Sequence, residues 1–420
     1  MQHQAPRGTA DILPEEQSYW DYVRSRAVSL AKLYGYEQID TPTFEDSRLF
    51  IRSVGEETDI VSKEMYTFQD RGGSDLTLRP EGTAPVCRAF IEHGMGNRPK
   101  PVKLFYFASI FRYDRPQAGR YREHHQFGFE AIGESSATLD TEVIDMAARL
   151  YGNLGLKTRP VQLNSIGCGV CRPRYLDELK RYYANRTQEL CADCQKRYQK
   201  NPLRLLDCKT PVCQAPAVSA PALVDFLCPD CAAHFAKLRA ALKNLDIAFE
   251  INNRLVRGLD YYTRTVFEIQ PEEEGAQSTI GGGGRYDRLI AQLGGEDTPS
   301  IGFATGIERI ILNLKRQNII VPTLPKPSVF IAHLGLAANT AAIALAAELR
   351  LQNFGVIQSF GEKSLKSQLR QATSFGCRYT VILGEEEMKN GTAMLKDFSS
   401  GEQQEIALSD LVNRLLAELT

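Results

Sequence analysis

The alternation of apolar and polar positions predicts mixed helices and strands in the first three quarters of the chain. Residues 14 to 34 have a helical pattern, which begins with Pro14 and carries Glu15 and Glu16 in its first turn, as helix N-termini favour. The same pattern predicts, in chain order, a helix at 83 to 94, a long hairpin at 104 to 133, a helix at 138 to 154, strands between about 249 and 270, a strand near 300 to 304 and a helix from about 306.

The stretch YYTRTVFEI, residues 261 to 269, is rich in aromatic and β-branched residues and is predicted to form a strand. Strict alternation along a strand would place Tyr261 and Tyr262 on opposite faces. Arg257 stands just ahead of this strand. Its plainest role would be an ion pair with Asp260 at the strand end.

The pattern changes beyond residue 320. The proline-rich stretch VPTLPKPS, residues 321 to 328, is typical of a linker. Strands and helices then alternate as β-α-β-α-β, which predicts a small α/β domain with a mainly parallel sheet. We therefore expect one domain at residues 1 to 325 and an α/β domain at 326 to 420. A cysteine-rich insertion at residues 165 to 245 interrupts the β-rich pattern of the first domain.

Composition excludes few classes of protein. The 420 residues are 43% hydrophobic and 24% charged, which is ordinary for a globular chain that can bury a sizeable core. The N-terminus lacks the apolar region of a signal peptide, and no window approaches about 18 uninterrupted apolar residues, so we expect no membrane span and a cytoplasmic location. A net charge of −1 neither demands nor excludes a polyanionic partner.

One stretch departs from this near-neutral balance. Residues 172 to 204 carry nine basic side chains against four acidic ones, with tyrosines interleaved. The basic residues are Arg172, Arg174, Lys180, Arg181, Arg186, Lys196, Arg197, Lys200 and Arg204, and the tyrosines are Tyr175, Tyr182, Tyr183 and Tyr198. Such a mixture suits phosphates and exposed bases. A solvated helical face is the alternative.

Ten cysteines are many for a chain expected in the cytoplasm. Eight of them form four close pairs, which are Cys168/Cys171, Cys191/Cys194, Cys208/Cys213 and Cys228/Cys231. Cytosolic disulfides are rare, and four soft thiolates suit tetrahedral zinc, so the pairs predict structural Zn²⁺. Nineteen residues separate the first two pairs and fourteen the last two, but this spacing leaves open which pairs join. Buried free thiols are the alternative.

The predicted hairpin carries candidate chemistry. Its loop, YDRPQAGRYRE, holds three arginines and a fourth stands at its root, and guanidinium groups match phosphate oxygens in pairs. These arginines are Arg112, Arg115, Arg120 and Arg122. In the return strand, Gln126, Gly128 and Glu130 share one face while the opposite face is apolar, which predicts a pocket floor. A polar strand face turned to water is the alternative.

Three further segments place polar groups at element ends. TLRPEGTA puts Glu81 and Thr83 where a strand leads into a helix, with plain helix capping as the alternative. GGGGRYDRL would let a ligand approach the backbone closely, with Tyr286 on the next helix. GFATGIERIIL could direct Arg309 back toward a phosphate or leave it at the surface. The sequence contains no Walker-type loop, and the glycine run has the wrong spacing for a dinucleotide fingerprint.

Taken together, these segments resemble the class II aminoacyl-tRNA synthetases, and within that class the histidyl-tRNA synthetases, over nearly the whole chain. The segments that carry the resemblance are RGTADILP at 7 to 14, YGYEQIDTPTFE at 34 to 45, TLRPEGTA at 77 to 84, FRYDRPQAGRYREHHQFGFE at 111 to 130, LVRGLDYYT at 255 to 263, GGGGRYD at 281 to 287 and GFATGIERI at 302 to 310. The resemblance implies an α+β fold with an antiparallel six-stranded catalytic core, a helical cysteine-rich insertion and a C-terminal anticodon-binding α/β domain. It also implies a homodimer that makes contact near Pro42.

The resemblance implies histidine–tRNA ligase activity. L-Histidine would react with ATP, accompanied by Mg²⁺, to give histidyl-adenylate and pyrophosphate, and histidine would then pass to the 3′ end of tRNA(His). Because the substrate carboxylate is already ionised at neutral pH, the first step needs charge stabilisation at the α-phosphate and no general base. By resemblance, Arg257 and Arg112 supply it.

The resemblance also implies roles for the remaining residues of the site. Glu81, Thr83 and Gln126 would hold the amino-group end of histidine, Glu130 with Tyr261 and Tyr262 would read the imidazole, Tyr286 would close the pocket, Arg309 would bind the γ-phosphate and Arg120 the outer phosphates. Asp114 stands where the class usually has a glutamate for the adenine amino group, and its shorter reach leaves adenine recognition open. The paired cysteines are not a general feature of the family, so zinc rests on their spacing alone.

Two other functions are open to a chain of this pattern. One is a synthetase-like regulatory subunit of histidine biosynthesis without aminoacylation. Relatives of that kind typically lose LVRGLDYYT and the anticodon-binding domain, and both are expected here. The other is a structural zinc or RNA-binding protein on an inactive synthetase scaffold. The intact set of Arg112, Arg257 and Arg309 argues against it.

Overall fold

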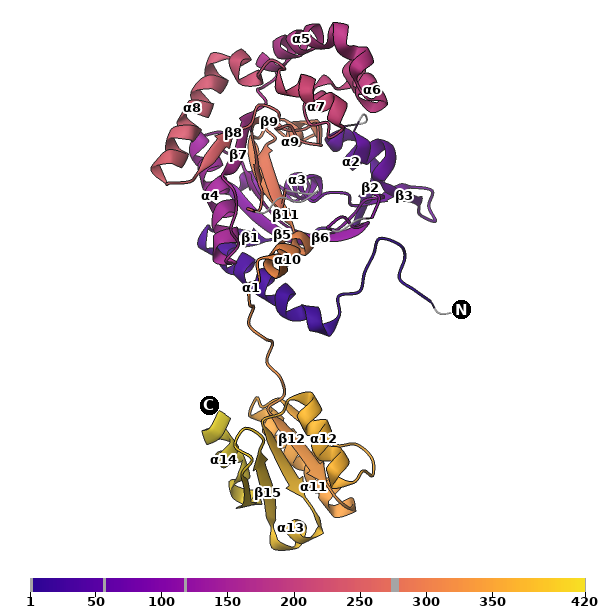
Figure 1. The fold of residues 1–420 in the computed structure, drawn as a ribbon, viewed down its shortest axis with the longest axis vertical. Coiled ribbons are helices and arrows are strands. Elements are labelled where there is room, and N and C mark those ends of the chain that lie inside the picture. Colours follow the sequence, from indigo (N-terminus) through magenta and orange to yellow (C-terminus); the bar gives the residue numbers. More distant parts are fainter. Residues whose placement is uncertain (1–2, 56–57, 117–118, 273–278, 420) are drawn as a thin grey trace. The chain divides into compact units, whose positions relative to one another are not determined.

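The computed structural model describes residues 3–55, 58–116, 119–272 and 279–419, and all statements below concern these residues. The chain divides into two compact units, Met1–Pro322 and Thr323–Thr420, which are described separately (Figure 1). Among the described helices, none is long and apolar enough to cross a membrane.

The first unit is built around an eight-stranded sheet of order β1-β5-β6-β11-β10-β9-β7-β8. In this order the strands are Glu37–Gln38, Val102–Phe111, Glu123–Ile132, Ser300–Gly306, Gly281–Arg285, Thr263–Ile269, Val161–Ser165 and Phe249–Ile251. Neighbours among the six inner strands pair antiparallel, and only the edge strands β1 and β8 pair parallel with theirs. The expected antiparallel six-stranded core is thus confirmed, with a short parallel strand added at each edge.

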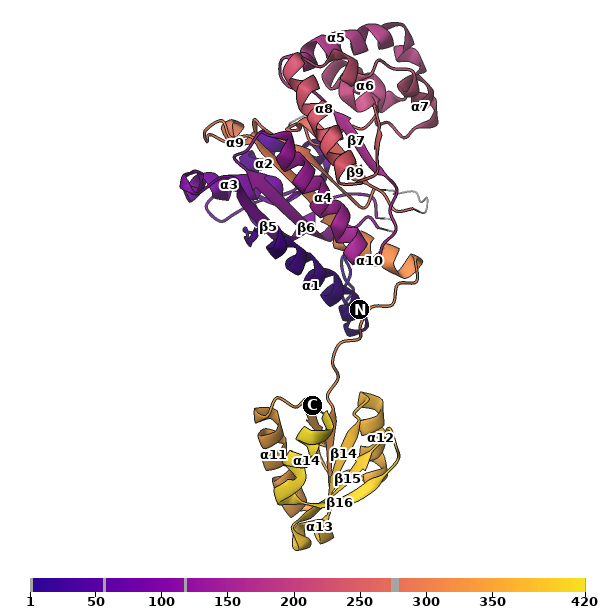
Figure 2. The ribbon, with the colours of Figure 1, turned by 90° about the vertical axis from the view of Figure 1, so that its left-hand side faces the viewer.

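Helices cover one face of this sheet with an apolar layer. They are α1 (Gln17–Leu33), α4 (Ala137–Asn153) and α10 (Ile307–Arg316). Their side chains, such as Val23 and Ile310, pack against Phe127 and Phe129 of β6 and Phe303 of β11 in one buried cluster. Figure 2 shows α1 and α4 running along this face. Because strand side chains alternate, Gln126 and Glu130, which flank these phenylalanines in β6, must point to the other face.

The opposite face of the sheet carries α3 (Thr83–Glu92), α9 (Leu289–Gln292) and a small second sheet. That sheet has the order β2-β4-β3, with strands Phe44–Asp46, Asp75–Leu78 and Tyr66–Gln69, and α2 (Ser47–Val54) packs beside it. Leu104 and Tyr106 of β5 point to this side and share an apolar cluster with Val86 of α3 and Val266 of β9. The cluster leaves room for a polar cleft above β6.

A helical insertion leaves the sheet after β7 and returns at β8 (Figure 1). Its helices are α5 (Cys171–Tyr183), α6 (Ala192–Lys200), α7 (Pro211–Val218) and α8 (Pro229–Asn244). They are joined by short 3₁₀ turns, and α8 packs back against α4 of the first unit. Tyr175, Leu179 and Tyr183 of α5 form the buried side of the insertion.

The second unit is a five-stranded sheet of order β13-β12-β14-β15-β16. The strands, in this order, are Val356–Gln358, Val329–His333, Tyr379–Leu383, Thr392–Asp397 and Gln403–Ala407, and the helices are α11 (Leu336–Leu351), α12 (Leu365–Phe375), α13 (Glu385–Asn390) and α14 (Leu408–Leu419). The expected parallel alternation is confirmed for β12, β13 and β14. The antiparallel addition of β15 and β16 was not predicted, since β16 is almost wholly exposed and shows no apolar alternation.

Candidate active site

A cleft of about 950 Å³ lies over the polar face of β6, β9, β10 and β11. It is lined by most of the residues that the sequence singled out, which are Glu81, Thr83, Arg112, Asp114, Arg120, Gln126, Arg257, Tyr261, Tyr262 and Arg309. Glu130 and Tyr286 lie behind its wall, each 1% exposed. Residues far apart in the chain are thus brought together in one hollow.

Arg257 is held by Glu268 of β9, so the ion pair with Asp260 that sequence alone suggested is wrong. Arg257 Nη1 donates to the Glu268 carboxylate, which also accepts a hydrogen bond of 2.7 Å from the Thr279 hydroxyl. Asp260 instead accepts from Asn201 Nδ2 at 2.8 Å. Burial opposes the charge of Arg257, but the Glu268 carboxylate outweighs it and holds the pKa above the usual value.

One N–H of this guanidinium remains available. Among the described residues, Arg257 Nε is buried without a hydrogen-bond partner. The side chain also lies over the ring of Tyr262, 5.7 Å from its centroid. A Cβ on Gly282 would stand 2.6 Å from Arg257 Nη1, so the glycine in β10 allows the guanidinium to lie against the sheet. Buried donors of this kind favour a ligand oxygen.

Backbone carbonyls hold the side chains of Arg112 and Arg309. Arg112 Nε donates to Pro80 O at 2.7 Å, and Arg309 donates from Nε to Gly119 O at 3.0 Å and from Nη1 to Thr279 O at 2.7 Å. Burial lowers the pKa of Arg309, and the neighbouring cations Arg120 and Arg112 lower it further. Positive charge is therefore concentrated in this part of the cleft, which favours a polyanion.

The arginine-bearing loop is only partly in the cleft. Arg120 pairs with Asp114 at 2.8 Å, and the Asp114 carboxylate also accepts the Arg115 backbone N–H at 2.7 Å. Arg122 lies over the ring of Tyr113, 3.8 Å from its centroid. The middle of the loop, residues 117 and 118, lies outside the described residues. Arg115 and Arg122 are thus not gathered with the cleft arginines.

Two glutamates organise the start of α3, one on the cleft wall and one behind it. Glu81 accepts the backbone N–H groups of Thr83 and Ala84, each at 2.7 Å, so it caps this helix while it also lines the cleft. Glu130 accepts hydrogen bonds from the Thr83 hydroxyl at 2.8 Å and the Tyr286 hydroxyl at 2.6 Å. Burial raises the pKa of Glu130 to about 8, although both hydroxyl donors lower it. Glu130 therefore holds a proton through much of the neutral range.

The tyrosines do not follow the expected alternation. Tyr261 and Tyr262 both line the cleft, with ring centroids 4.7 Å apart, so the prediction of opposite faces is wrong. Regular pairing of β9 begins only at Thr263, and Arg264 has a left-handed φ of 47°. The turn before the strand, rather than the pleat, directs these two rings.

The glycine run at residues 281 to 284 also differs from the prediction. Residues 281 to 285 form the central strand β10, and Tyr286 follows that strand instead of lying on the next helix, α9, as predicted. A Cβ on Gly283 would stand 2.1 Å from the carbonyl oxygen of Gly302 on β11. Glycines are therefore needed because the strands approach closely, and not because the chain bends.

Two cleft residues were missed by sequence reasoning. Tyr106 of β5 fills the space above Gly82 and Gly128, where an added Cβ would stand 2.4 Å and 2.3 Å from its ring. His124 lines the cleft, and burial, together with Arg112 and Arg309, lowers its pKa to about 3. It is neutral at physiological pH. The only signal for Tyr106 was its position on the strand paired with the predicted floor.

The basic, tyrosine-rich stretch is less exposed than its composition suggests. Tyr175 and Tyr183 are fully buried in the insertion and cannot stack on bases, so that expectation is wrong for them. Arg197 pairs with Asp59 at 2.8 Å, and Arg204 with Asp207 at 3.1 Å, on the cleft wall. Most of the other basic residues lie on the exposed surface of the insertion. They are Arg174, Lys180, Arg181, Arg186, Lys196 and Lys200.

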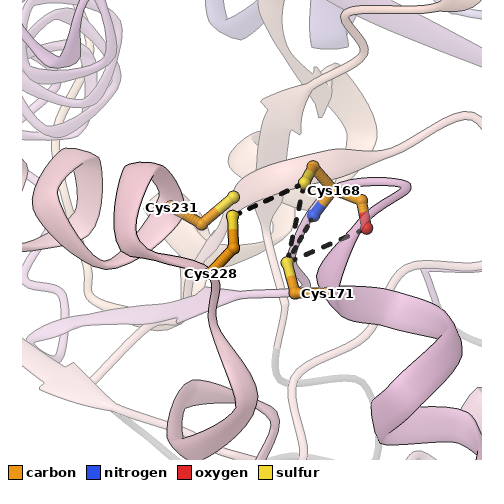
Figure 3. A group of neighbouring side chains, drawn as sticks. All are labelled: Cys168, Cys171, Cys228 and Cys231. Atoms are coloured by element: carbon orange, nitrogen blue, oxygen red, sulfur yellow. Dashed lines mark hydrogen bonds between the residues drawn. The ribbon is translucent and has the colours of Figure 1, made fainter.

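The eight paired cysteines come together in two groups. Cys168 and Cys171 meet Cys228 and Cys231, as Figure 3 shows, while the two middle pairs meet each other. The pairs are thus nested rather than joined in chain order. All ten cysteines are free of disulfides. In the part of the chain that the structure describes, only these two groups bring together three or more histidine, cysteine, aspartate or glutamate side chains that could hold a metal ion.

Comparison with known proteins gives a consistent answer. The family described as histidyl-tRNA synthetase matches residues 8–170 and 177–310, and the anticodon binding domain family matches residues 328–418. A histidine–tRNA ligase of Dehalococcoides mccartyi is 63% identical over 410 residues, 98% of each chain. One of Desulforamulus reducens is 49% identical over 407 residues, 97% of each chain.

Solved structures agree with this similarity. The apo histidyl-tRNA synthetase of S. aureus has a TM-score of 0.83 at 36% identity, covering 98% of this chain and 99% of the other. A protein of Bacillus halodurans C described as an ATP phosphoribosyltransferase regulatory subunit/histidyl-tRNA synthetase has a TM-score of 0.64 at 21% identity, covering 91% of this chain and 98% of the other. The latter likeness shows a shared fold alone.

Proposed function

Because the chain belongs to the histidyl-tRNA synthetase family, we propose that the cleft over β6 and β9 is where histidine and ATP react. The chain is an ATP-dependent aminoacyl-tRNA ligase specific for histidine. One observation supports the cleft most strongly. Arg112, Arg257 and Arg309, from three distant segments, converge on a hollow lined by tyrosines and a capping glutamate. The regulatory alternative is disfavoured, because the curated relatives that are 63% and 49% identical over 98% and 97% of the chain are histidine–tRNA ligases.

We assign the activation chemistry to Arg257 and Arg112. The histidine carboxylate is ionised at neutral pH, so it can attack the α-phosphate without a general base, and the barrier lies in the charge that develops on the phosphate oxygens. Arg257 contributes its unpartnered Nε–H to this charge, and Arg112 is already fixed by the Pro80 carbonyl. Donors that are fixed before the reaction cost no reorganisation.

The other ATP contacts follow the charge of the cleft. Arg309 would bind the γ-phosphate and Arg120 the outer phosphates, while Asp114 would face the adenine amino group after releasing Arg120. Mg²⁺ usually binds through one or two carboxylates and substrate phosphates, and the cleft wall offers carboxylates such as Glu268. The ion would therefore enter with ATP and neutralise phosphate charge.

On the histidine side, Glu81, Thr83 and Gln126 would receive the amino group, beside the rings of Tyr261 and Tyr262. We propose that the carboxyl group of Glu130 recognises the imidazole ring of histidine. Its carboxyl is engaged by Thr83 and Tyr286, so an imidazole nitrogen would either replace one of these hydroxyls or be read through it. A site with buried polar partners rejects analogues that leave them unpaired by roughly 10⁴-fold or more, which makes an editing domain unnecessary.

The wider assembly is also a proposal. We divide the chain into a catalytic domain at residues 1–325, with the insertion at 165–245, and a domain at 326–420 that reads the anticodon of tRNA(His). The neighbouring rings of Phe44 and Phe68, 50% and 43% exposed, support a homodimer contact near Pro42. Free thiols throughout support the reducing cytoplasm, and Zn²⁺ is expected in the insertion as a structural ion.

The decisive test is ATP–pyrophosphate exchange with each of the twenty amino acids in turn. Exchange with histidine alone is the expected result, followed by transfer of labelled histidine to tRNA(His). If folded, metal-replete protein exchanged with no amino acid, the proposed reaction at this cleft would be wrong.

A further inference from the structure

The two cysteine groups have the dimensions of single-ion sites. We name Cys168, Cys171, Cys228 and Cys231 the sheet-end group, and Cys191, Cys194, Cys208 and Cys213 the inner group. In each, the four sulfurs lie within 4.8 Å of one another. Four sulfurs at about 2.3 Å from a tetrahedral Zn²⁺ stand about 3.8 Å apart. The sulfur–sulfur distances of 3.7 Å and 3.9 Å in the sheet-end group and 3.9 Å in the inner group match this edge length.

Other sulfur chemistry fits less well. A disulfide needs sulfurs about 2.05 Å apart, far closer than these. The thiolates of an iron–sulfur cluster bind different irons and therefore stand wider apart than around a single ion. Backbone N–H groups point at the sulfurs, from Cys168 to Cys171 Sγ at 3.1 Å and from Cys191 to Cys213 Sγ at 3.2 Å. Such donors stabilise the thiolate form that binds zinc.

The sheet-end group lies where the insertion leaves and rejoins the catalytic core. Cys168 follows β7, Cys171 begins α5, and Cys228 directly precedes α8, the helix that leads back to β8 (Figure 3). The sulfurs of Cys168 and Cys228 meet although 60 positions separate them in the chain. One ion there would close the part of the insertion that holds α5, α6 and α7 into a loop, and cross-links that close long loops remove the most chain entropy.

The same corner is bonded to the histidine side of the cleft. Arg172, next to Cys171, donates from Nη2 to the carbonyl oxygen of Tyr262 at 2.6 Å. Arg264 and the segment before Cys168 exchange two backbone hydrogen bonds, Ile166 N–H to Arg264 O at 2.7 Å and Arg264 N–H to Gly167 O at 2.8 Å. The irregular start of β9, which directs both cleft tyrosines, is therefore hydrogen-bonded to residues next to Cys168 and Cys171 of the sheet-end group.

The inner group provides a matched comparison. Its cysteines belong to α6, α7 and the turns before them, all inside the insertion. Cys191 and Cys208 reach the cleft wall. However, Arg172, which donates a hydrogen bond to Tyr262, follows a cysteine of the sheet-end group and not one of the inner group. An ion in the inner group would hold the insertion's own helices together.

We propose that each group binds one Zn²⁺, and that the sheet-end ion positions Tyr262, through Arg172, for histidine binding. The proposal that zinc binds does not depend on the function of the cleft. The proposed effect on histidine binding rests on the proposed function of the cleft as the histidine pocket. Tyr262 is the residue that would touch histidine, and Arg172 is a positioning residue that acts through it.

Elemental analysis of the purified full-length protein should find two zinc ions per chain. The double variant Cys168→Ser/Cys228→Ser and its match Cys194→Ser/Cys213→Ser, whose cysteines do not line the cleft, should each retain one. The sheet-end variant should raise the KM for histidine about tenfold, while its KM for ATP stays near that of the parent. The inner variant should leave both constants within about twofold. Fewer than two ions in the parent, or iron with sulfide in place of zinc, would overturn the metal assignment.

A variant that keeps both ions tests the link by itself. Arg172→Ala should retain two zinc ions and reproduce the rise in KM for histidine, with kcat little changed. An unchanged KM would refute the positioning role. Cobalt replacement in the parent, read by sulfur-to-cobalt charge-transfer absorption, tests the tetrathiolate sites even if the cysteine variants fail to fold. Two ions with no histidine-dependent exchange would contradict the proposed function while leaving the zinc sites intact.

Discussion

Arg285 and Asp140 form an ion pair that is completely closed to solvent. Arg285 Nη1 lies 2.5 Å from Asp140 Oδ1, and both side chains are 0% exposed. The other carboxylate oxygen accepts from Thr265 at 2.6 Å and contacts His234 of α8 at 2.8 Å. This carboxylate therefore joins α4 to β9, β10 and the last helix of the insertion.

Removal of the Asp140 charge should strongly destabilise the fold. Asp140→Asn would remove the fully buried anion beside Arg285 and leave it only the partly exposed carboxylate of Asp287, 2.9 Å from its Nε, at a cost of up to about 3–5 kcal/mol in the free energy of unfolding. Asp297→Asn is the matched control, because Asp297 pairs with Arg288 at 3.3 Å on the surface and should cost less than about 1 kcal/mol. Denaturant unfolding of both variants measures the difference. Equal decreases in the free energy of unfolding would show that the buried ion pair stabilises the fold no more than the surface pair does.

Arg257→Ala should lower the rate of ATP–pyrophosphate exchange by about 10² to 10³, the usual effect of losing one preorganised donor at a charged transition state. Histidine binding should weaken but remain measurable by calorimetry. Arg316→Ala removes an exposed arginine at the end of α10 and serves as the control, with exchange expected to stay near the parental rate. Parental activity in Arg257→Ala would contradict the assigned mechanism.

Glu130 should make stability depend on pH in the neutral range. Its pKa is raised by burial from 4.5 to about 8, so between these values the folded protein binds the proton that the unfolded chain releases. Stability should therefore fall as pH rises through this window and level off above about pH 8. Thermal unfolding across this range should show a flatter profile for Glu130→Gln than for the parent. Parallel profiles would mean that Glu130 titrates normally.

Glycines of the same chain should respond oppositely to alanine. Gly283→Ala places a methyl group 2.1 Å from the Gly302 carbonyl oxygen between two central strands and should destabilise by about 1–3 kcal/mol or more. Gly152→Ala, near the end of α4, meets no atom within 4 Å and should stabilise by up to about 1 kcal/mol through helix propensity. The sign of each change in unfolding free energy is the measurement. A stable Gly283→Ala protein would show that β10 and β11 can move apart.

The polar floor and the apolar core on β6 could be anticipated because their signal is local, whereas the antiparallel six-stranded core and the roles of Arg112 and Arg257 were implied only by the resemblance to the histidyl-tRNA synthetases. Polar residues on one face of β6, with phenylalanines on the other, already imply a floor and a core. What sequence could not show depends on contacts between distant segments. The buried partner of Arg285 lies on α4, and the partner of Arg257 lies within β9, where no spacing rule points to it.

Failures of the period-2 rule have a similar origin. Tyr261 and Tyr262 share the cleft because β9 begins at Thr263, two residues later than predicted, and Arg264 departs from extended backbone. The glycine run gave no strand signal because glycine is rare within strands, yet here close strand approach requires it. The nested joining of the cysteine pairs could not be read from spacing, since it follows from where α8 returns to the sheet.

The edges of the large sheet have a consequence for how the chain behaves among its copies. Exposed strand edges can recruit strands from other molecules, and long flat edges do so most readily. Here the outermost strands, β1 and β8, have only two and three residues. Each rim therefore offers a foreign strand very few backbone groups, and fibril-like association through this sheet is unfavourable even when many copies of the chain are made together.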